Sequence, residues 1–300
     1  MSIIENALKK ANQQGLIDNN NKQDTQEKLS SELNPDYQRK QERNGFEFQS
    51  LSQSFDSQVA INWNALALDG YLDRNNANSQ LAEEFRVIKR PLVNNIQGAE
   101  INGLSRPNLI LICSSLPSEG KTFVSINLAL SIANELDKNV LLIDADVEKP
   151  SISKKLGIKQ SVGLIEYLEN EQLTFSDILL KTDLPNLSII PAGKRHKFST
   201  ELLSSQRMYF FAEEVSRRYK DRIVIFDSPP LLVATQAQVL AELVGQVVLV
   251  IAAEETPQNV VNESVAKLAN CDVVMTLLNK TKKEFDLYGY GYGYGKYGHS

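Results

Sequence analysis

From residue 108 onward, short and continuously apolar runs alternate with segments whose apolar residues recur at helical spacing. A run that is apolar at every position predicts a strand buried on both faces, and such strands occur in parallel sheets covered by helices on both sides. The expected strands are 108–113, 139–144, 187–191, 222–227, 246–252 and 272–278, and the expected helices are 121–136, 201–219, 236–243 and 257–269. The pattern therefore predicts an α/β fold built on a parallel sheet, which binds ligands at the carboxyl ends of its strands.

The two ends of the chain differ in composition from this central part. Of the first 50 residues, 18 are Asn, Gln or Ser, and helical periodicity is limited to residues 3–11. We expect residues 1–57 to form a mostly disordered arm with one short amphipathic helix, which is either a frayed terminus or a docking helix. Residues 58–285 would form the folded domain, and residues 286–300 a flexible tail rich in Tyr and Gly.

Charge and composition exclude several classes of protein. The net charge of −5 gives no reason to expect nucleic acid as the main partner. Cys113 and Cys271 match no metal-ligand spacing and indicate reduced thiols in a cytosolic protein. No apolar stretch approaches the roughly 18 residues that a membrane-spanning helix needs, and the first residues do not form a secretory signal. These features favour a cytoplasmic protein.

Residues 115–122, Ser-Leu-Pro-Ser-Glu-Gly-Lys-Thr, follow an apolar run and open a helical one, which is the context required of a phosphate-binding loop. Gly120 would let the backbone approach phosphate, Lys121 would reach the β- and γ-phosphates, and the Thr122 hydroxyl would bind Mg²⁺. The usual first glycine is replaced by Ser115, and an ordinary strand-to-helix turn is the alternative. The expected nucleotide-binding residues are Ser118, Glu119, Gly120, Lys121, Thr122, Phe123 and Asn279.

Three further apolar runs end in polar residues that suit the same site. Asp144 and Asp146 could hold Mg²⁺ or accept a proton from an attacking hydroxyl, and Asp227 ends another run. Asn279 ends the last run, where its amide could read the adenine edge or simply form a turn. Which of Asp144 and Asp146 is the base stays open. The expected metal ligands are Thr122, Asp144, Asp146 and Asp227, and the expected catalytic residues are Lys121, Asp144 and Asp146.

The C-terminal sequence YGYGYGYGKYGHS separates its tyrosines with glycine, which prevents a stable helix and leaves each ring free to enter a pocket. Flexible phenols beside a phosphoryl-transfer site are natural acceptors, although a low-complexity tail that self-associates is an alternative. The expected phosphoacceptors are Tyr288, Tyr290, Tyr292, Tyr294 and Tyr297.

Together with AEEFRVIKRPL, SSLPSEGKT, LLIDADVEKP, PAGKRHKFSTELLSSQRM and IVIFDSPPLL, this tail resembles the bacterial tyrosine kinases of exopolysaccharide loci, especially their soluble autokinase subgroup. The resemblance runs from about Asp69 to the end of the chain. It implies a P-loop NTPase-like fold, ATP and Mg²⁺ as cofactors, and phosphorylation of the tail between subunits of a ring, which would regulate exopolysaccharide synthesis and export. It also implies a membrane-spanning chain-length or export protein as activator, which would recruit the kinase to the inner face of the membrane.

Two other classes compete with this interpretation. Cell-division and plasmid-partition ATPases share the fold but carry a second lysine early in the loop, where this chain has Leu116. A positioning ATPase is therefore disfavoured. The remaining alternative is a non-catalytic, ATP-gated assembly scaffold that uses the tail as a docking element.

A helix is expected from Ser79, and Pro91 should kink, end or restart it. The kinase family has a helix with Glu, Arg and Arg at three-residue intervals that closes the ring. The matching residues here are Glu83, Arg86 and Lys89, and the lysine keeps the charge but not the bidentate fork of arginine. A solvated helical face is the alternative.

The segment Lys194-Arg195-His196-Lys197 is strongly basic. It could border the nucleotide or a partner, but the pattern favours a solvated charge cluster.

Overall fold

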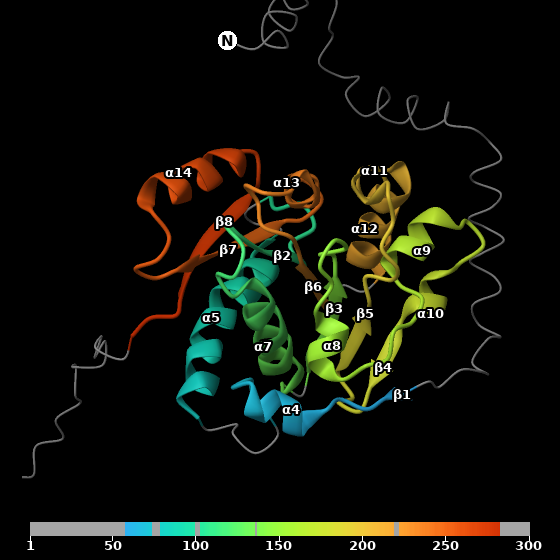
Figure 1. Ribbon diagram of the computed structural model, residues 1–300, viewed down its shortest axis with the longest axis horizontal. Coiled ribbons are helices and arrows are strands. Elements are labelled where there is room, and N and C mark those ends of the chain that lie inside the picture. The colour runs from blue at the N-terminus through green and yellow to red at the C-terminus, as the bar shows by residue number, and fades with distance from the viewer. Residues whose placement is uncertain (1–57, 74–78, 100–102, 136, 219–221, 283–300) are drawn as a thin grey trace, which may run out of the picture. The chain divides into compact units, whose positions relative to one another are not determined.

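The computed structural model describes residues 58–73, 79–99, 103–135, 137–218 and 222–282. The expected N-terminal arm and C-terminal tail lie outside these residues. The described strands form one eight-stranded sheet in the order β1-β4-β5-β3-β6-β2-β7-β8, with helices on both faces (Figure 1). The strands are β1 (Gln58–Val59), β2 (Leu109–Ser114), β3 (Asn139–Asp144), β4 (Leu180–Thr182), β5 (Leu187–Ile190), β6 (Arg222–Asp227), β7 (Gln246–Ala252) and β8 (Val273–Asn279). The predicted P-loop NTPase-like α/β fold is confirmed.

The sequence pattern predicted a parallel sheet, but the observed sheet contains one antiparallel pairing. Strand β4 pairs with β5 in antiparallel fashion, whereas every other pairing is parallel. A tight connection joins β4 to β5, where the Leu187 amide donates to the Leu184 carbonyl at 2.9 Å. Antiparallel neighbours need only such a short turn, and a strand of three residues is too short to give a periodic signal.

The side chains of β2 show how the two faces are covered. Ile110 and Ile112 pack in one core cluster with α5 (Gln80–Gln97) and α7 (Lys121–Ala133). Leu109 and Leu111 point the other way, into a cluster with residues of the helices on the opposite face. The remaining helices are α4 (Trp63–Leu68), α8 (Ile152–Leu156), α9 (Leu164–Glu169), α10 (Phe175–Ile178), α11 (Ser199–Leu203), α12 (Gln206–Arg218), α13 (Thr235–Ala241) and α14 (Gln258–Lys267).

Two helix expectations need correction. Helix α5 begins after its N-cap Ser79 as predicted, and it continues through Pro91, so two of the three expected outcomes, an end and a restart, do not occur. The Gln246 side-chain amide of β7 donates to the Leu92 carbonyl at 3.2 Å and anchors this part of the helix to the sheet. The single helix expected over 201–219 is two helices, α11 and α12, separated at Ser204 and Ser205.

The break between α11 and α12 has a local cause. The Ser204 hydroxyl donates to the Thr200 carbonyl at 2.8 Å, and the Ser205 hydroxyl accepts from the Met208 amide at 3.2 Å. Serine side chains thus replace backbone partners and start a new helix. Among the described residues, no helix combines the length and the apolar character needed to cross a bilayer.

Candidate functional site

The loop between β2 and α7 carries two residues with left-handed backbone, Ser118 at φ +68° and Gly120 at φ +98°. A Cβ atom at Gly120 would lie 2.0 Å from the side-chain nitrogen of Asn279, so only glycine fits this position. The Asn279 amide in turn donates to the Glu119 carbonyl at 2.8 Å. Gly120 is also the N-cap of α7. The loop thus ends at a helix N-terminus, where backbone N–H groups and the helix dipole favour an anion.

Side chains tie this loop to the neighbouring β7–α14 region. Glu119 is buried, and its carboxylate accepts from the Leu116 amide at 2.6 Å and from the Thr256 hydroxyl. The Ser115 hydroxyl, at the position of the usual first glycine, accepts from the Ser264 hydroxyl of α14 at 2.8 Å. The substitution of serine for glycine thus adds an anchor, and the loop keeps its helix-opening geometry.

Two aspartates meet at the carboxyl ends of β3 and β6, where Asp144 and Asp227 are register partners. Both side chains are fully buried, at 0% exposure. Asp227 accepts from the Thr122 hydroxyl at 2.7 Å and from the Ser125 hydroxyl at 2.9 Å. The hydroxyl of Ser151 lies 3.3 Å from that of Thr122, which links the α8 segment to the same cluster.

The two oxygens of the Asp144 carboxyl have different environments. One accepts from the amides of Ser151 and Ile152, each at 3.0 Å. The other, Oδ1, is buried and has no hydrogen-bond partner among the described residues. An unpartnered buried carboxylate oxygen is costly unless a cation or proton satisfies it.

Burial, followed by the neighbouring charge of Asp227, raises the pKa of Asp144 to about 8, although the hydrogen bonds from the Ser151 and Ile152 amides act in the opposite direction. Burial also raises the pKa of Asp227, against the opposing effects of Lys121 and the Thr122 hydroxyl. Without a bound cation Asp144 therefore tends to hold a proton near neutral pH. A hard cation that prefers oxygen ligands would replace that proton.

Lys121 lies beside these acids, and its ammonium is 2.7 Å from Asp146 Oδ2. Burial would lower the pKa of Lys121, but the charges of Asp227 and Asp146 raise it overall, so the side chain stays charged. Asp146 also accepts from the Lys149 amide at 3.1 Å. The Lys121 ammonium is thus paired with Asp146, and a bound phosphate would compete with Asp146 for it.

These residues fit Mg²⁺ and a triphosphate. Among the described residues no group of three or more His, Cys, Asp or Glu side chains could hold a metal ion alone. Mg²⁺ in nucleotide sites is held by one or two protein oxygens together with phosphates and water. The orphaned oxygen of Asp144 and the hydroxyl of Thr122 supply that partial set.

The structure brings together most of the predicted site residues: Ser118, Glu119, Gly120, Lys121, Thr122, Asp144, Asp146, Asp227 and Asn279. Phe123 differs, because its ring packs 5.0 Å from that of Tyr71 and 6.3 Å from that of Phe85, so only its backbone belongs to the loop. Ser151 had no signal in the sequence, because its contact with the Thr122 hydroxyl depends on the fold. Ser125 had only a weak signal, since it follows Lys121 by one helical turn.

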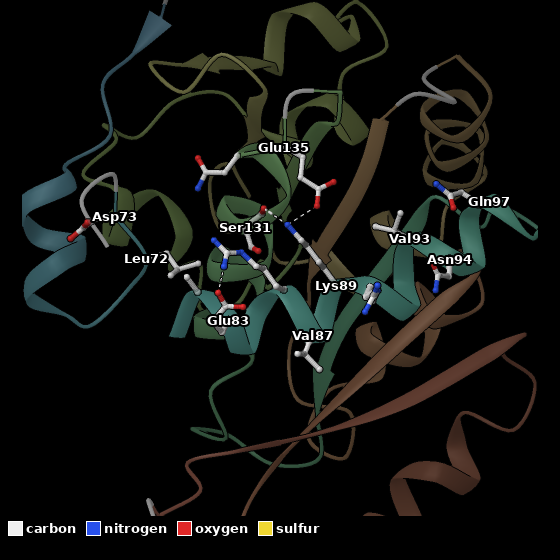
Figure 2. Close-up of a pocket in the computed structure, with 14 residues that line it drawn as sticks. Leu72, Asp73, Glu83, Val87, Lys89, Val93, Asn94, Gln97, Ser131 and Glu135 are labelled. Carbon is white, nitrogen blue, oxygen red and sulfur yellow. Dashed lines mark hydrogen bonds and ion pairs between the residues drawn. The ribbon is translucent and has the colours of Figure 1, made fainter. Parts of the chain in front are cut away.

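The predicted interface residues lie on α5, some distance from this loop. Glu83 and Arg86 form an ion pair on the surface, with side-chain exposures of 59% and 44%. Lys89 instead turns toward α7 of its own chain, 2.6 Å from Glu135 and 2.9 Å from the Ser131 carbonyl. All three residues line a pocket of about 730 Å³ between α5 and the end of α7. Figure 2 shows Glu83 and Lys89 of α5 in this pocket, with Ser131 and Glu135 beside Lys89. The predicted phosphoacceptors, Tyr288, Tyr290, Tyr292, Tyr294 and Tyr297, lie outside the described residues.

Comparison with known proteins agrees with this geometry. The family model described as AAA domain matches residues 110–286. The tyrosine-protein kinase YwqD of Bacillus subtilis is 31% identical over 214 residues, which cover 69% of this chain and 86% of YwqD. The succinoglycan biosynthesis transport protein ExoP of Rhizobium meliloti is 32% identical over 229 residues, 74% of this chain and 28% of ExoP. The chain spans only 19% to 28% of the length of such longer relatives.

A solved structure gives the same result. The crystal structure of the VpsO kinase domain is similar with a TM-score of 0.54 and 30% identity, and the match covers 68% of this chain and all (100%) of that domain. The site therefore occurs in a chain that matches the tyrosine-protein kinase YwqD over 86% of the length of YwqD. The chain belongs to the bacterial tyrosine-protein kinase family.

Proposed function

We propose that this protein is an ATP- and Mg²⁺-dependent autokinase that phosphorylates the tyrosines of its own C-terminal tail, between neighbouring subunits. The observation that carries the proposal is the buried Asp144 oxygen without a partner, beside Thr122 and Lys121 at a phosphate-binding loop. A non-catalytic, ATP-gated scaffold would bind Mg-ATP through the same residues, so a phosphotransfer assay has to separate the two functions.

The chain's own residues have distinct tasks in this mechanism. The amides from Glu119 to Thr122 hold the terminal phosphates, and Lys121 leaves Asp146 to neutralise their charge. Asp144 and Thr122 hold the Mg²⁺. Mg-ATP supplies the γ-phosphoryl group and, through its metal, part of the charge stabilisation.

Release from Lys121 would give Asp146 its second task. Its carboxylate, freed from the 2.7 Å ion pair, can accept the proton of an incoming tyrosine hydroxyl. Asp144 is less suited to this task, because its one unpartnered oxygen would serve the metal. We therefore assign Asp146 as the base and Asp144 as a metal ligand.

Assembly would bring the acceptor to this site. The exposed pair of Glu83 and Arg86 on α5 would contact a neighbour's active site in a ring, whereas Lys89 mainly fastens α5 to α7. Phosphates on the acceptors Tyr288, Tyr290, Tyr292, Tyr294 and Tyr297 would add charge and separate the subunits. Similarity to ExoP, a transport protein of succinoglycan biosynthesis, supports a role in exopolysaccharide export. The activator would be a membrane-spanning export protein that recruits this chain to the cytoplasmic face of the membrane.

The test uses two complementary variants. Lys121→Met removes the phosphate clamp, and we expect phosphotyrosine after incubation with Mg-ATP to fall by roughly 100-fold or more, with unchanged far-UV circular dichroism. Lys159→Met, which changes an exposed lysine, is the matched control. A second variant changes all five tail tyrosines to Phe, which keeps the rings but removes every acceptor.

Mixing the two variants separates transfer within a chain from transfer between chains. The all-Phe variant should phosphorylate the tail of the Lys121→Met protein, as intact mass would show. Phosphotyrosine retained by Lys121→Met alone contradicts the site assignment. Modification mainly at Tyr167, Tyr209 or Tyr219 in the wild type contradicts the acceptor assignment.

A further inference from the structure

We propose that the basic loop, residues 194–197, binds phosphotyrosine in the tail of a neighbouring copy and retains that tail between successive phosphoryl transfers. The inference rests on the proposed function for the origin of the phosphotyrosine. It adds a second site for the same tail, distinct from the phosphate-binding loop.

The charges of the basic loop are available. The chain carries a net charge of −5, yet four consecutive residues here are basic. Lys194 and Arg195 are exposed and form no ion pair with any described residue, and Lys197 lies over the Phe198 ring at 5.5 Å. Only His196 approaches an acid, with Nε2 3.6 Å from Glu169. Lys194 and Arg195 are therefore two neighbouring positive charges that are free to interact with an anion.

The backbone of the basic loop is held in place at both ends. Gly193 has φ +87°, and a Cβ there would lie 1.9 Å from a Glu166 carboxylate oxygen. The other oxygen of Glu166 accepts from the Lys194 amide at 3.0 Å. At the far end, the Phe198 amide donates to His196 Nδ1 at 3.1 Å. A pre-shaped loop loses less entropy when it binds a ligand.

The basic loop also lies at the correct edge of the sheet. It follows β5, the neighbour of β3, and precedes α11 (Figure 1). The Ser199 hydroxyl, directly after the loop, donates to Glu148 at 2.8 Å, and Glu148 is in the segment that begins with Asp146. The loop is thus joined to the acidic motif of the candidate active site.

The spacing of tyrosines in the tail suits the distance between the two strands that lead into these loops. The order β5-β3-β6-β2 puts three strand intervals between β5 and β2, which is roughly 14 Å at about 4.8 Å per interval. An extended chain advances about 3.5 Å per residue, so roughly four residues cover this distance. Tyr288 and Tyr292 are separated by that number, as are Tyr290 and Tyr294. A phosphotyrosine in the basic loop would thus present the tyrosine four positions away to Lys121.

The side chains of the basic loop suit phosphotyrosine. Arginine binds phosphate oxygens through two parallel hydrogen bonds, and lysine adds a point charge to a group of about −1.5 to −2. Phe198 is 52% exposed beside Lys197 and offers a face for the tyrosine ring. A membrane surface would need a wider basic patch, whereas four residues match one or two phosphates.

The test measures binding, so it does not depend on catalysis. The probe is a fluorescent synthetic peptide of residues 283–300, either unmodified or with phosphotyrosine at position 292. The protein is the full chain with all five tail tyrosines changed to Phe, saturated with Mg-ADP to fill the phosphate-binding loop. We expect fluorescence anisotropy to show about 10-fold tighter binding of the phosphopeptide.

The comparison of two double variants decides the proposal. Lys194→Gln with Arg195→Gln should reduce the preference to less than about 2-fold, whereas Lys159→Gln with Lys267→Gln, which removes the same charge elsewhere, should retain it. Equal affinity for both peptides, or an unchanged preference in the first variant, overturns the proposal. If the wild type shows no peptide preference but sediments with phosphatidylserine vesicles through Lys194 and Arg195, the loop contacts lipid and the proposal is also wrong. Loss of tail phosphorylation in the kinase assay would contradict the proposed function alone.

Discussion

The phosphate-binding region and the α5 surface contain similar charged residues in opposite environments. Asp144 and Asp227 are fully buried and hydrogen-bonded, and Lys121 is 14% exposed against Asp146. On α5, the Glu83–Arg86 pair lies open to solvent. Because water screens exposed charges and cannot screen buried ones, the first group should control proton and cation binding while the second should contribute little to stability. The difference separates the buried group that we propose for catalysis from the exposed group that we propose for assembly.

The largest expected effect comes from Asp144→Asn. The folded pKa of about 8 lies above the ordinary value of 3.8, so the folded state binds more protons than the unfolded state between these pH values. Unfolding free energy of the wild type should therefore fall as pH rises from about 4 to about 8, by an amount on the order of a few kcal/mol. Asparagine cannot ionise and removes this loss.

Thermal unfolding of the ligand-free proteins across this pH range measures the difference. Relative to wild type, the Asp144→Asn variant should gain stability progressively as pH rises, and Mg-ATP should then stabilise the wild type more than the variant. A difference in melting temperature that stays constant from pH 5 to pH 8 would show that folding does not raise the pKa of Asp144.

A middle-sized effect is expected from Ser125→Ala. Its hydroxyl donates to Asp227 Oδ1 at 2.9 Å and to the Lys121 carbonyl one turn earlier. Removing a donor from a buried carboxyl should lower the unfolding free energy by about 1–3 kcal/mol. Urea denaturation gives this value.

Ser204→Ala is the matched control, because that hydroxyl also donates to a carbonyl one turn earlier but is exposed and touches no acid. Its cost should stay within about 0.5 kcal/mol. Equal losses in both variants would mean that the buried acid plays no part.

The smallest effect on stability is expected from Arg86→Ala. Its exposed ion pair should contribute less than about 0.5 kcal/mol, yet sedimentation velocity should show loss of the higher oligomer if α5 contacts a neighbour. Arg217→Ala changes a comparable exposed pair with Glu213 on α12 and should leave assembly intact. Dissociation of both variants alike would indicate a general charge effect, not an interface at α5.

Local sequence was sufficient for the central strands and the main motifs. The runs 139–144, 222–227 and 246–252 match β3, β6 and β7 residue for residue, since continuous apolar sequence of that length is stable only when covered on both faces. The sequence also predicts that the phosphate-binding loop, Asp144 and Asp227 lie close together. Each comes at the end of a strand, and parallel strands end at the same edge of the sheet.

Tertiary structure decided what local sequence left open. Strand β4 pairs with β5 in antiparallel fashion, and helix α5 continues through Pro91. Lys89 forms an ion pair with Glu135 of its own chain. Tertiary structure also gave Asp144 one satisfied and one unpartnered oxygen, which distinguishes its role from that of Asp146. Sequence determines which groups occur at each strand end, but hydrogen-bond partners and pKa values depend on residues distant along the chain that only the folded packing brings within reach.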